Sequence, residues 1–243
     1  MSIFNENLKE IKLYEVLIFF IVLYLFLFVL GKFEFPINEK WIYLFVIFYF
    51  IYKLRDSIPA IKDDLADCFS KNYFKNIVLI VVLNIFFSYG MLYLTNANFQ
   101  QFDFLKNSLP VAGGFISTVV ISAICEELIF RGVFISRLKL LVPTTFAILI
   151  SSLLFGALHS FGGMFSAFVF AICMAILYVK SDNICVPIFA HFLNNLVAEI
   201  IVRVDVNEVL FTNASVMSGV SILALISAII LFIGIYRELN NIK

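Results

Sequence analysis

The chain has 243 residues, of which 63% are hydrophobic and only 14% charged, and its mean hydropathy is +1.04. This composition lies far from that of an average soluble domain and predicts a multi-pass integral membrane protein. Seventeen basic residues balance seventeen acidic ones, and no run of like charge occurs, which excludes the basic surface that nucleic-acid binding requires.

Eight apolar runs occur along the chain, and each is long enough, or nearly so, to cross a bilayer core, which takes about 20 residues. The runs cover residues 14–31, 36–52, 76–95, 109–136, 144–161, 163–179, 183–203 and 216–236. The second run is the weakest, because its purely apolar part is short and must be extended by residues 36–40. We predict an all-α, polytopic transmembrane helix bundle of about eight spans, folded as one integral-membrane domain over residues 1–243.

Lysine and arginine are distributed unevenly among the segments that join these runs. If the N-terminus is inside, thirteen of the seventeen basic residues fall on the inside and four on the outside. The cytoplasmic side of a membrane protein carries the basic excess, so both termini are predicted to be cytoplasmic. The first run follows a segment whose charges cancel and lacks a small-residue cleavage site, which indicates a retained anchor rather than a signal peptide.

The connection between the second and third runs has the pattern of an amphipathic helix. Ile61, Leu65 and Phe69 recur at helical spacing with charged residues opposite, and Ser57 and Pro59 suit its first turn. Helices of this kind lie in the plane of a membrane, so we expect this one on the cytoplasmic membrane surface.

The cysteines show neither a CxxC pair nor another ligand-like spacing. They are Cys68, Cys125, Cys173 and Cys185, and at least three of them lie in apolar helical runs. We expect small buried thiols rather than a metal site.

Very few ionisable residues fall inside the apolar runs. Such a side chain near the middle of a bilayer costs about 2.5–3.5 kcal/mol on insertion scales, so each one is a candidate functional residue. In the stretch EELIFR, Arg131 follows Glu127 at i,i+4, the better orientation for an ion pair. This pairing would leave Glu126 on another helix face and free to act chemically. A helix end at the cytoplasmic surface with ordinary solvated charges is the alternative.

The first histidine follows one helical hairpin later. If the chain turns near residue 141, antiparallel packing at 1.5 Å per residue brings His159 to within about 5 Å of the depth of Glu126. Phe155 lies one turn before His159 on the same face and is placed to cover the imidazole. A packed, hydrogen-bonded core histidine is the alternative.

The second histidine lies in the seventh run. His191 and Asn195 form an i,i+4 pair on one helix face, whereas Asn194 points away from it and is expected to bond a neighbouring helix. Polar contacts between helices would also explain this pair. However, the chain has only two histidines, and both occur with a distinctive i±4 partner. We therefore predict one buried site that combines them with Glu126.

These groups are sufficient for hydrolysis of a peptide bond inside a membrane. A buried carboxylate such as Glu126 can take a proton from water and later give it to a leaving amine. His159 can orient the water. His191 and the Asn195 amide can donate hydrogen bonds to the developing oxyanion, each worth about 2.7–4 kcal/mol in a dry site.

Three motifs carry a resemblance to a known family. EELIFR, FGALH and HFLNN resemble, in order and spacing, the EExxxR, FxxxH and HxxxN motifs of the CAAX prenyl protease type II and bacteriocin-processing family, also called CPBP or Abi, of intramembrane proteases. The resemblance covers about residues 121–203, within a motif core of about 109–203. It implies a membrane-embedded peptidase, a hydrolase similar to CAAX prenyl protease 2.

The resemblance also implies roles for individual residues. Glu126 would be the catalytic base, His159 would act with it on the water, and His191 with Asn195 would form the oxyanion hole. The residues expected to support these groups are Glu127, Arg131 and Phe155.

Relatives have been described both as metal-dependent and as metal-free glutamate proteases. Glu126, His159 and His191 could imitate a zinc site with an open position. However, no HExxH motif occurs, and an asparagine is a poor zinc ligand but a good oxyanion donor. We expect no cofactor, and zinc bound by these three residues is the alternative.

The substrate follows from the resemblance only as a class. Eukaryotic relatives remove the last three residues of prenylated CaaX proteins, whereas bacterial relatives are associated with bacteriocin self-immunity, peptide maturation and surface proteins. A chain rich in Phe, Ile, Asn and Lys is typical of an AT-rich bacterium. We expect a bacterial plasma-membrane protease that acts in the lipid bilayer on a hydrophobic peptide or a lipidated protein.

Two other functions are compatible with the same sequence. A non-catalytic membrane scaffold or bacteriocin-immunity protein of the same fold would retain the helices without hydrolysis. A proton-coupled transporter would also use intramembrane Glu and His. The transporter ranks last, because neither an internal repeat nor paired broken helices are visible.

Overall fold

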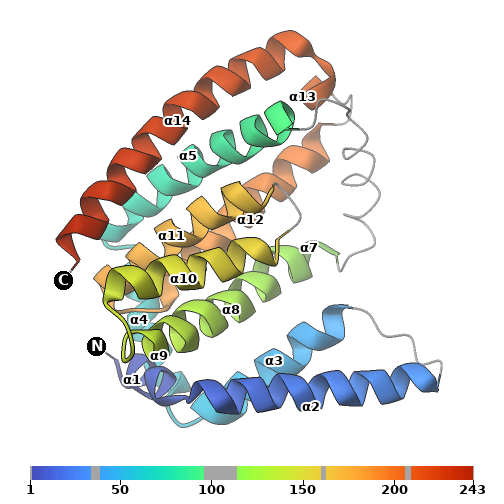
Figure 1. The fold of residues 1–243 in the computed structure, drawn as a ribbon, viewed down its shortest axis with the longest axis vertical. Helices are drawn as coiled ribbons and strands as arrows, with labels where there is room; N and C mark the ends of the chain where they lie inside the picture. The colour runs from blue at the N-terminus through green and yellow to red at the C-terminus, as the bar shows by residue number, and fades with distance from the viewer. Residues whose placement is uncertain (1, 34–38, 96–113, 160–162, 206–208, 243) are drawn as a thin grey trace.

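The computed structural model describes residues 2–33, 39–95, 114–159, 163–205 and 209–242, and all regular structure in these ranges is helical (Figure 1). The separate helices are α1 (Ile3–Glu10), α2 (Leu13–Lys32), α3 (Glu39–Leu54), the 3₁₀ turn η1 (Ile58–Ala60), α4 (Ile61–Cys68), α5 (Lys71–Thr95), α10 (Thr144–Ala157), α11 (Met164–Ser181), α12 (Cys185–Val204), α13 (Val209–Thr212) and α14 (Ala214–Asn241). One further helix runs without interruption over 114–138 and comprises α7 (Gly114–Ile116), η2 (Ser117–Ile121), α8 (Ser122–Glu127), η3 (Leu128–Ile135) and α9 (Ser136–Leu138). The predicted all-α class is confirmed for this part of the chain.

Each of the eight predicted apolar runs coincides with a helix. By length and composition, five helices among the described residues can cross a membrane, namely α2, α5, α11, α12 and α14. Helices α3 and α10 are apolar but shorter. The predicted bounds at residues 36, 109 and 161 lie outside the described residues. The chain is therefore an integral membrane protein, and the number of eight crossings stays a prediction.

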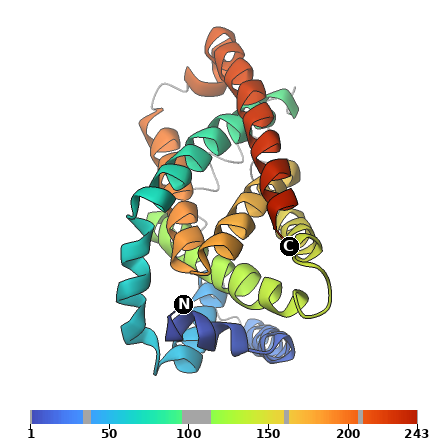
Figure 2. The same cartoon turned by 90° about the vertical axis from the view of Figure 1, so that its left-hand side faces the viewer.

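Both chain termini lie at the same end of the bundle. The N-terminus, the C-terminus and the turn between α9 and α10 are on the left in Figure 1, and this end faces the viewer in Figure 2. The predicted location of both termini on one side of the membrane requires such an arrangement. That this side is cytoplasmic stays a prediction.

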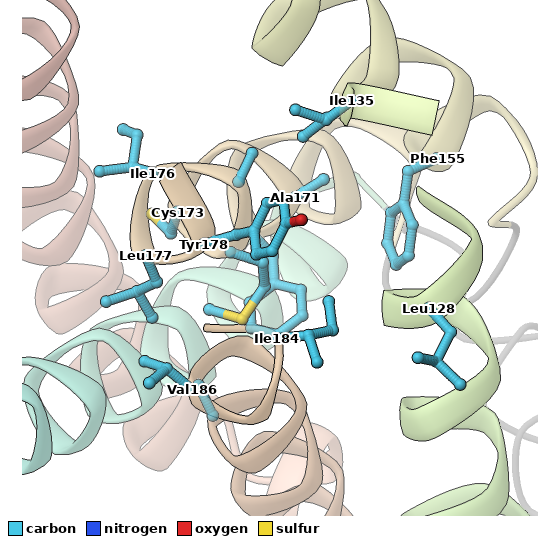
Figure 3. Packing of buried hydrophobic residues seen from close by; sticks show 14 of the residues in the cluster. Leu128, Ile135, Phe155, Ala171, Cys173, Ile176, Leu177, Tyr178, Ile184 and Val186 are labelled. Carbon is cyan, nitrogen blue, oxygen red and sulfur yellow. The ribbon is translucent and has the colours of Figure 1, made fainter. Parts of the chain in front are cut away.

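Helix α11 forms the centre of the core. All residues of this helix over 169–178 are buried, which is the longest such stretch within the described ranges. Figure 3 shows its side chains packed between those of η3, α10 and the start of α12. The four cysteines are buried and free, as predicted. In contrast, α2 is almost wholly exposed on the outside of the bundle, where an apolar helix suits lipid.

The helix over 114–138 departs twice from α geometry. Its segments η2 and η3 are π-helical, and they flank the short α8, at the end of which the two glutamates lie. A π turn widens a helix and shifts its hydrogen bonds from i→i−4 to i→i−5, and such turns are frequent at functional sites. The sequence predicted one helix here but gave no sign of the π turns.

The predicted surface helix between the second and third runs is present as η1 and α4. Leu65 and Phe69 are 47% and 64% exposed, as expected for a face toward lipid. The opposite face differs from the prediction, because Asp64 is buried against the protein instead of being solvated. Its carboxylate accepts hydrogen bonds from Ser2 and Asn5 at the N-terminal α1. The polar face of α4 therefore holds α1 in place.

Helices α5 and α14 approach closely at a pair of small residues. A Cβ atom added at Gly90 of α5 would lie 2.2 Å from the Cβ of Ala224 in α14. Small residues at such contacts let two membrane helices pack backbone against backbone.

This contact predicts opposite effects for two glycine substitutions. Gly90→Ala should lower the melting temperature in detergent, since overpacking costs about 1–3 kcal/mol. Gly219→Ala in α14, where a new Cβ meets nothing within 4 Å, should leave the temperature unchanged or raise it, because alanine favours a helix by about 1 kcal/mol over glycine. Equal effects of the two substitutions would contradict the close approach of α5 and α14.

Candidate active site

The two glutamates have different surroundings, as the helical spacing predicted. Glu127 is fully buried, and its Oε2 lies 3.1 Å from Nε of Arg131, one turn further along the same helix. The side chain of Glu126 is 15% exposed and points toward the histidines. The predicted division between a paired Glu127 and an available Glu126 is therefore present in the structure.

The guanidinium of Arg131 links three helices. It is 1% exposed, and its Nη2 donates a hydrogen bond of 3.1 Å to the backbone carbonyl of Ala171 in α11. The guanidinium also lies over the ring of Phe155 in α10, 4.6 Å from the ring centroid. A charge at this depth is tolerable because it has an ion pair, a carbonyl acceptor and an aromatic face.

His159 lies just beyond the end of α10, at the level of Glu126. Its Nε2 is 3.4 Å from Oε2 of Glu126, so the antiparallel hairpin brings the two residues to one depth as predicted. The Nδ1–H donates a 2.7 Å hydrogen bond to the carbonyl of Phe155, and the imidazole stacks on the Phe155 ring with centroids 4.1 Å apart. Phe155 thus fixes both the plane and the tautomer of this imidazole.

His191 in α12 is held by the other glutamate. Its Nδ1 lies 2.7 Å from Oε1 of Glu127, and its Nε2 lies 3.9 Å from Oε2 of Glu126. The ring of Phe170 in α11 packs edge-on against the imidazole at 5.1 Å between centroids. The sequence predicted only Arg131 as a partner of Glu127. This prediction was incomplete, because Oε2 of Glu127 pairs with Arg131 and Oε1 contacts His191.

Asn195 lies one turn beyond His191 and faces the same helix over 114–138. Its Nδ2 donates a 3.0 Å hydrogen bond to the carbonyl of Thr118 in η2, so one N–H bond is engaged and the second remains for another acceptor. The Oδ1 of Asn195 is 3.5 Å from Nδ2 of Asn194. The Oδ1 of Asn194 in turn accepts a hydrogen bond of 2.9 Å from Nδ2 of Asn84 in α5. The prediction that Asn194 bonds a neighbouring helix is confirmed. Because the Thr118 carbonyl only accepts, it fixes which end of the Asn195 amide carries the hydrogens.

One residue near Glu126 was missed by the sequence analysis. The hydroxyl of Tyr43 in α3 donates to Oε1 of Glu126 at 3.3 Å. Tyr43 lies in an almost uninterrupted aromatic and aliphatic run, WIYLFVIFYFIY, in which no spacing distinguishes one tyrosine from another. Asn84 and the carbonyl of Ala171 escaped notice for the same reason, since both belong to apolar helices without a motif.

The hydrogen bonds at Nδ1 determine what the histidines present to Glu126. Carbonyl and carboxylate oxygens only accept, so both Nδ1 atoms carry hydrogen, and in a neutral ring Nε2 then has a lone pair. Both Nε2 atoms face Oε2 of Glu126, which is buried and has no hydrogen-bond partner among the described residues. Oε2 of Glu126 and the nearer Nε2, that of His159, are two acceptors that match the two hydrogens of one water molecule.

The same three residues were the alternative zinc ligands. Two ligands on a tetrahedral Zn²⁺ with bonds of about 2.1 Å lie about 3.4 Å apart. The 3.4 Å between His159 and Glu126 fits this value, whereas the 3.9 Å between His191 and Glu126 exceeds it. Within the described ranges, no three His, Cys, Asp or Glu side chains are arranged to hold a metal ion. The side chains as placed thus do not form a three-ligand cage.

The segment that holds these residues matches a known protein family. Residues 108–197 match the family model of Rce1-like proteins, described as type II CAAX prenyl endopeptidases. No curated protein and no solved structure matches the chain. The matched segment contains all seven predicted site residues and excludes α3 and α5, which supply Tyr43 and Asn84. Over this segment, which holds every predicted site residue, the chain is similar to the Rce1-like type II CAAX prenyl endopeptidases.

Proposed function

We propose that this protein is a glutamate-type intramembrane endopeptidase that hydrolyses a peptide bond in a hydrophobic, membrane-associated substrate. The observation that carries the proposal is the convergence of Glu126 Oε2 with Nε2 of His159 and of His191. These groups come from three helices that the sequence separates by more than thirty residues each. A solvated helix end would not assemble such a set.

The first chemical step uses Glu126 and His159. A water molecule that contacts both side chains donates one hydrogen to Nε2 of His159 and the other to Oε2 of Glu126. As the water oxygen attacks the carbonyl carbon of the substrate, Glu126 takes its proton, which is general base catalysis. The carbonyl double bond becomes a C–O⁻ bond, and the tetrahedral intermediate carries that negative charge.

The second step uses the groups on α12. The free N–H of Asn195 donates to the oxyanion. Nε2 of His191 is the second donor when the ring enters the reaction with hydrogen on both nitrogens and keeps both throughout, so that no proton is transferred to it during the step. Glu127 accepts from Nδ1–H on the opposite side of that ring at 2.7 Å and so fixes the orientation of the imidazole. Glu126 then returns its proton to the leaving nitrogen, the C–N bond breaks, and an acid and an amine are released.

The physiological setting is proposed on the family and on the charge distribution. We infer a bacterial plasma-membrane protein with eight crossings and both termini in the cytoplasm. Its substrate is a prenylated CaaX-like protein or an unprenylated, bacteriocin-like peptide. Both classes would approach through lipid, which suits the apolar outer surface of the bundle.

A catalytically idle scaffold or immunity protein is the second candidate. It would keep the helices and their packing but would not need a water site between Glu126 and His159. The buried ion pair of Glu127 with Arg131 is compatible with either function, because it serves the fold.

Cleavage by the purified protein tests the proposal. The full chain in proteoliposomes is incubated with a farnesylated CaaX peptide, the same peptide without the lipid, and a hydrophobic leader peptide. We expect mass spectrometry to show two complementary fragments of at least one probe. A folded protein that leaves all three probes intact would favour the scaffold.

A chelator arm of this experiment tests the metal-free mechanism. Because Glu126 itself serves as the base in the proposed steps, the rate should be unchanged after incubation with 1,10-phenanthroline or EDTA. Loss of cleavage on chelation, restored by Zn²⁺ but not by Mg²⁺, would overturn the metal-free mechanism and favour zinc at Glu126, His159 and His191.

A further inference from the structure

Helix α3 reaches the candidate site although it lies outside the segment that matches the family. It touches α8 at two successive residues. The thiol of Cys125 donates to the backbone carbonyl of Tyr43 at 3.5 Å, and the hydroxyl of Tyr43 donates to Oε1 of the next residue, Glu126, at 3.3 Å. Tyr43 therefore contacts α8 with both its backbone and its side chain.

The carboxylate of Glu126 has little else to fix its orientation. Its Oε2 faces the two histidines at 3.4 and 3.9 Å and has no hydrogen-bond partner among the described residues. The terminal torsion of a glutamate is broad and roughly two-fold, so without a second contact the carboxylate plane could turn freely. The Tyr43 hydroxyl donates to the other oxygen, Oε1, at 3.3 Å, which is long for an O–H···O bond but restricts this rotation.

We propose that Tyr43 is a positioning residue, whose hydroxyl holds Oε1 of Glu126 so that Oε2 faces the water that Glu126 shares with His159. The inference rests on the proposed endopeptidase function. It extends the site to a fourth membrane helix, and it makes the docking of the α2–α3 hairpin a condition for catalysis. The hydroxyl acts through Glu126 and does not itself contact the scissile bond.

Replacement of Tyr43 by phenylalanine removes only the hydroxyl. In a continuous assay with a fluorogenic CaaX peptide, we expect Tyr43→Phe to lower kcat about 10- to 100-fold, the range for loss of a hydrogen bond to a charged group or for a misplaced catalytic group. KM should stay within about twofold of the wild-type value, because the hydroxyl serves the transition state and not substrate binding. Tyr52→Phe in the same helix, where the side chain is exposed, is the matched control and should leave both constants unchanged.

Two kinetic outcomes would overturn the inference. One is a Tyr43→Phe variant with the kcat of the wild type. The other is a variant whose kcat falls together with a rise in KM and with a large loss of melting temperature, since Tyr43 would then serve only the fold.

A thermal double-mutant cycle tests the contact without any activity. Tyr43→Phe should lower the melting temperature by about 2–4 °C in the wild-type background and not at all when Glu126 is already alanine. Equal losses in both backgrounds would overturn the coupling of the two residues. If wild-type protein cleaves no probe, the proposed function fails while the cycle still decides whether Tyr43 holds Glu126.

Discussion

Glu126→Gln is expected to reduce kcat/KM about 10²- to 10⁴-fold, the range that a general base contributes. Glutamine has nearly the same size and keeps an oxygen that can accept from Tyr43, but it cannot take a proton from water. The fold should be unaffected, because the ion pair that stabilises the helix belongs to Glu127. The initial cleavage rate of the variant in proteoliposomes is compared with that of the wild type. The melting temperature of the variant is first shown to match that of the wild type.

The matched control for this substitution is Glu10→Gln, which makes the same chemical change at an exposed position of α1. It should retain the rate of the wild-type protein. Full activity of Glu126→Gln, or an equal loss in both variants, would remove Glu126 from the chemistry and return the site to a structural role.

Arg131→Leu is expected to cause the largest loss of stability. It leaves the carboxylate of Glu127 buried without its cation, and the removal of one partner of a buried pair costs about 3–5 kcal/mol. For a chain of this size the melting temperature should fall by about 6–20 °C. Activity should fall with it, because Glu127 also holds Nδ1 of His191. Thermal unfolding in detergent, followed by intrinsic fluorescence, measures the effect.

A second substitution separates the charge from the packing. Glu127→Gln added to Arg131→Leu removes the uncompensated carboxylate and should recover part of the lost melting temperature. Arg55→Leu changes an exposed arginine beyond α3 and should have little effect. If the double variant is as unstable as Arg131→Leu alone, the loss comes from the missing contacts to Ala171 and Phe155 rather than from the buried charge.

The contacts that the sequence predicted are those set by helical spacing or by a single hairpin. Glu127 with Arg131, and Phe155 with His159, are both i,i+4 pairs, so their meeting follows from the helix itself. That Glu126 and His159 lie at the same depth follows from counting residues on both sides of one short turn. Such geometry needs no knowledge of how distant helices pack.

The contacts that the sequence did not predict depend on packing between distant helices. Tyr43 meets Glu126 across 83 positions, His191 meets Glu127 across 64, and Asn84 meets Asn194 across 110. In a helix that is apolar on all sides, hydrophobic periodicity does not tell which face turns toward the protein and which toward lipid. The rotation of α3 and α5 therefore could not be derived, although their positions along the chain were correct.

The pairing of Glu127 with Arg131 within one helix also bears on the order of assembly. An unpaired charge opposes the entry of a helix into lipid, whereas this helix carries its own counter-ion at a distance of one turn. Glu127 and Arg131 can therefore enter lipid as a neutral pair before α11 supplies the carbonyl of Ala171 and before α12 brings His191, and Glu126 is the one of the two glutamates that has no counter-ion on its own helix. Part of the polar centre is thus neutralised by a contact that needs no other helix, whereas the partners of Glu126 all come from elsewhere in the chain.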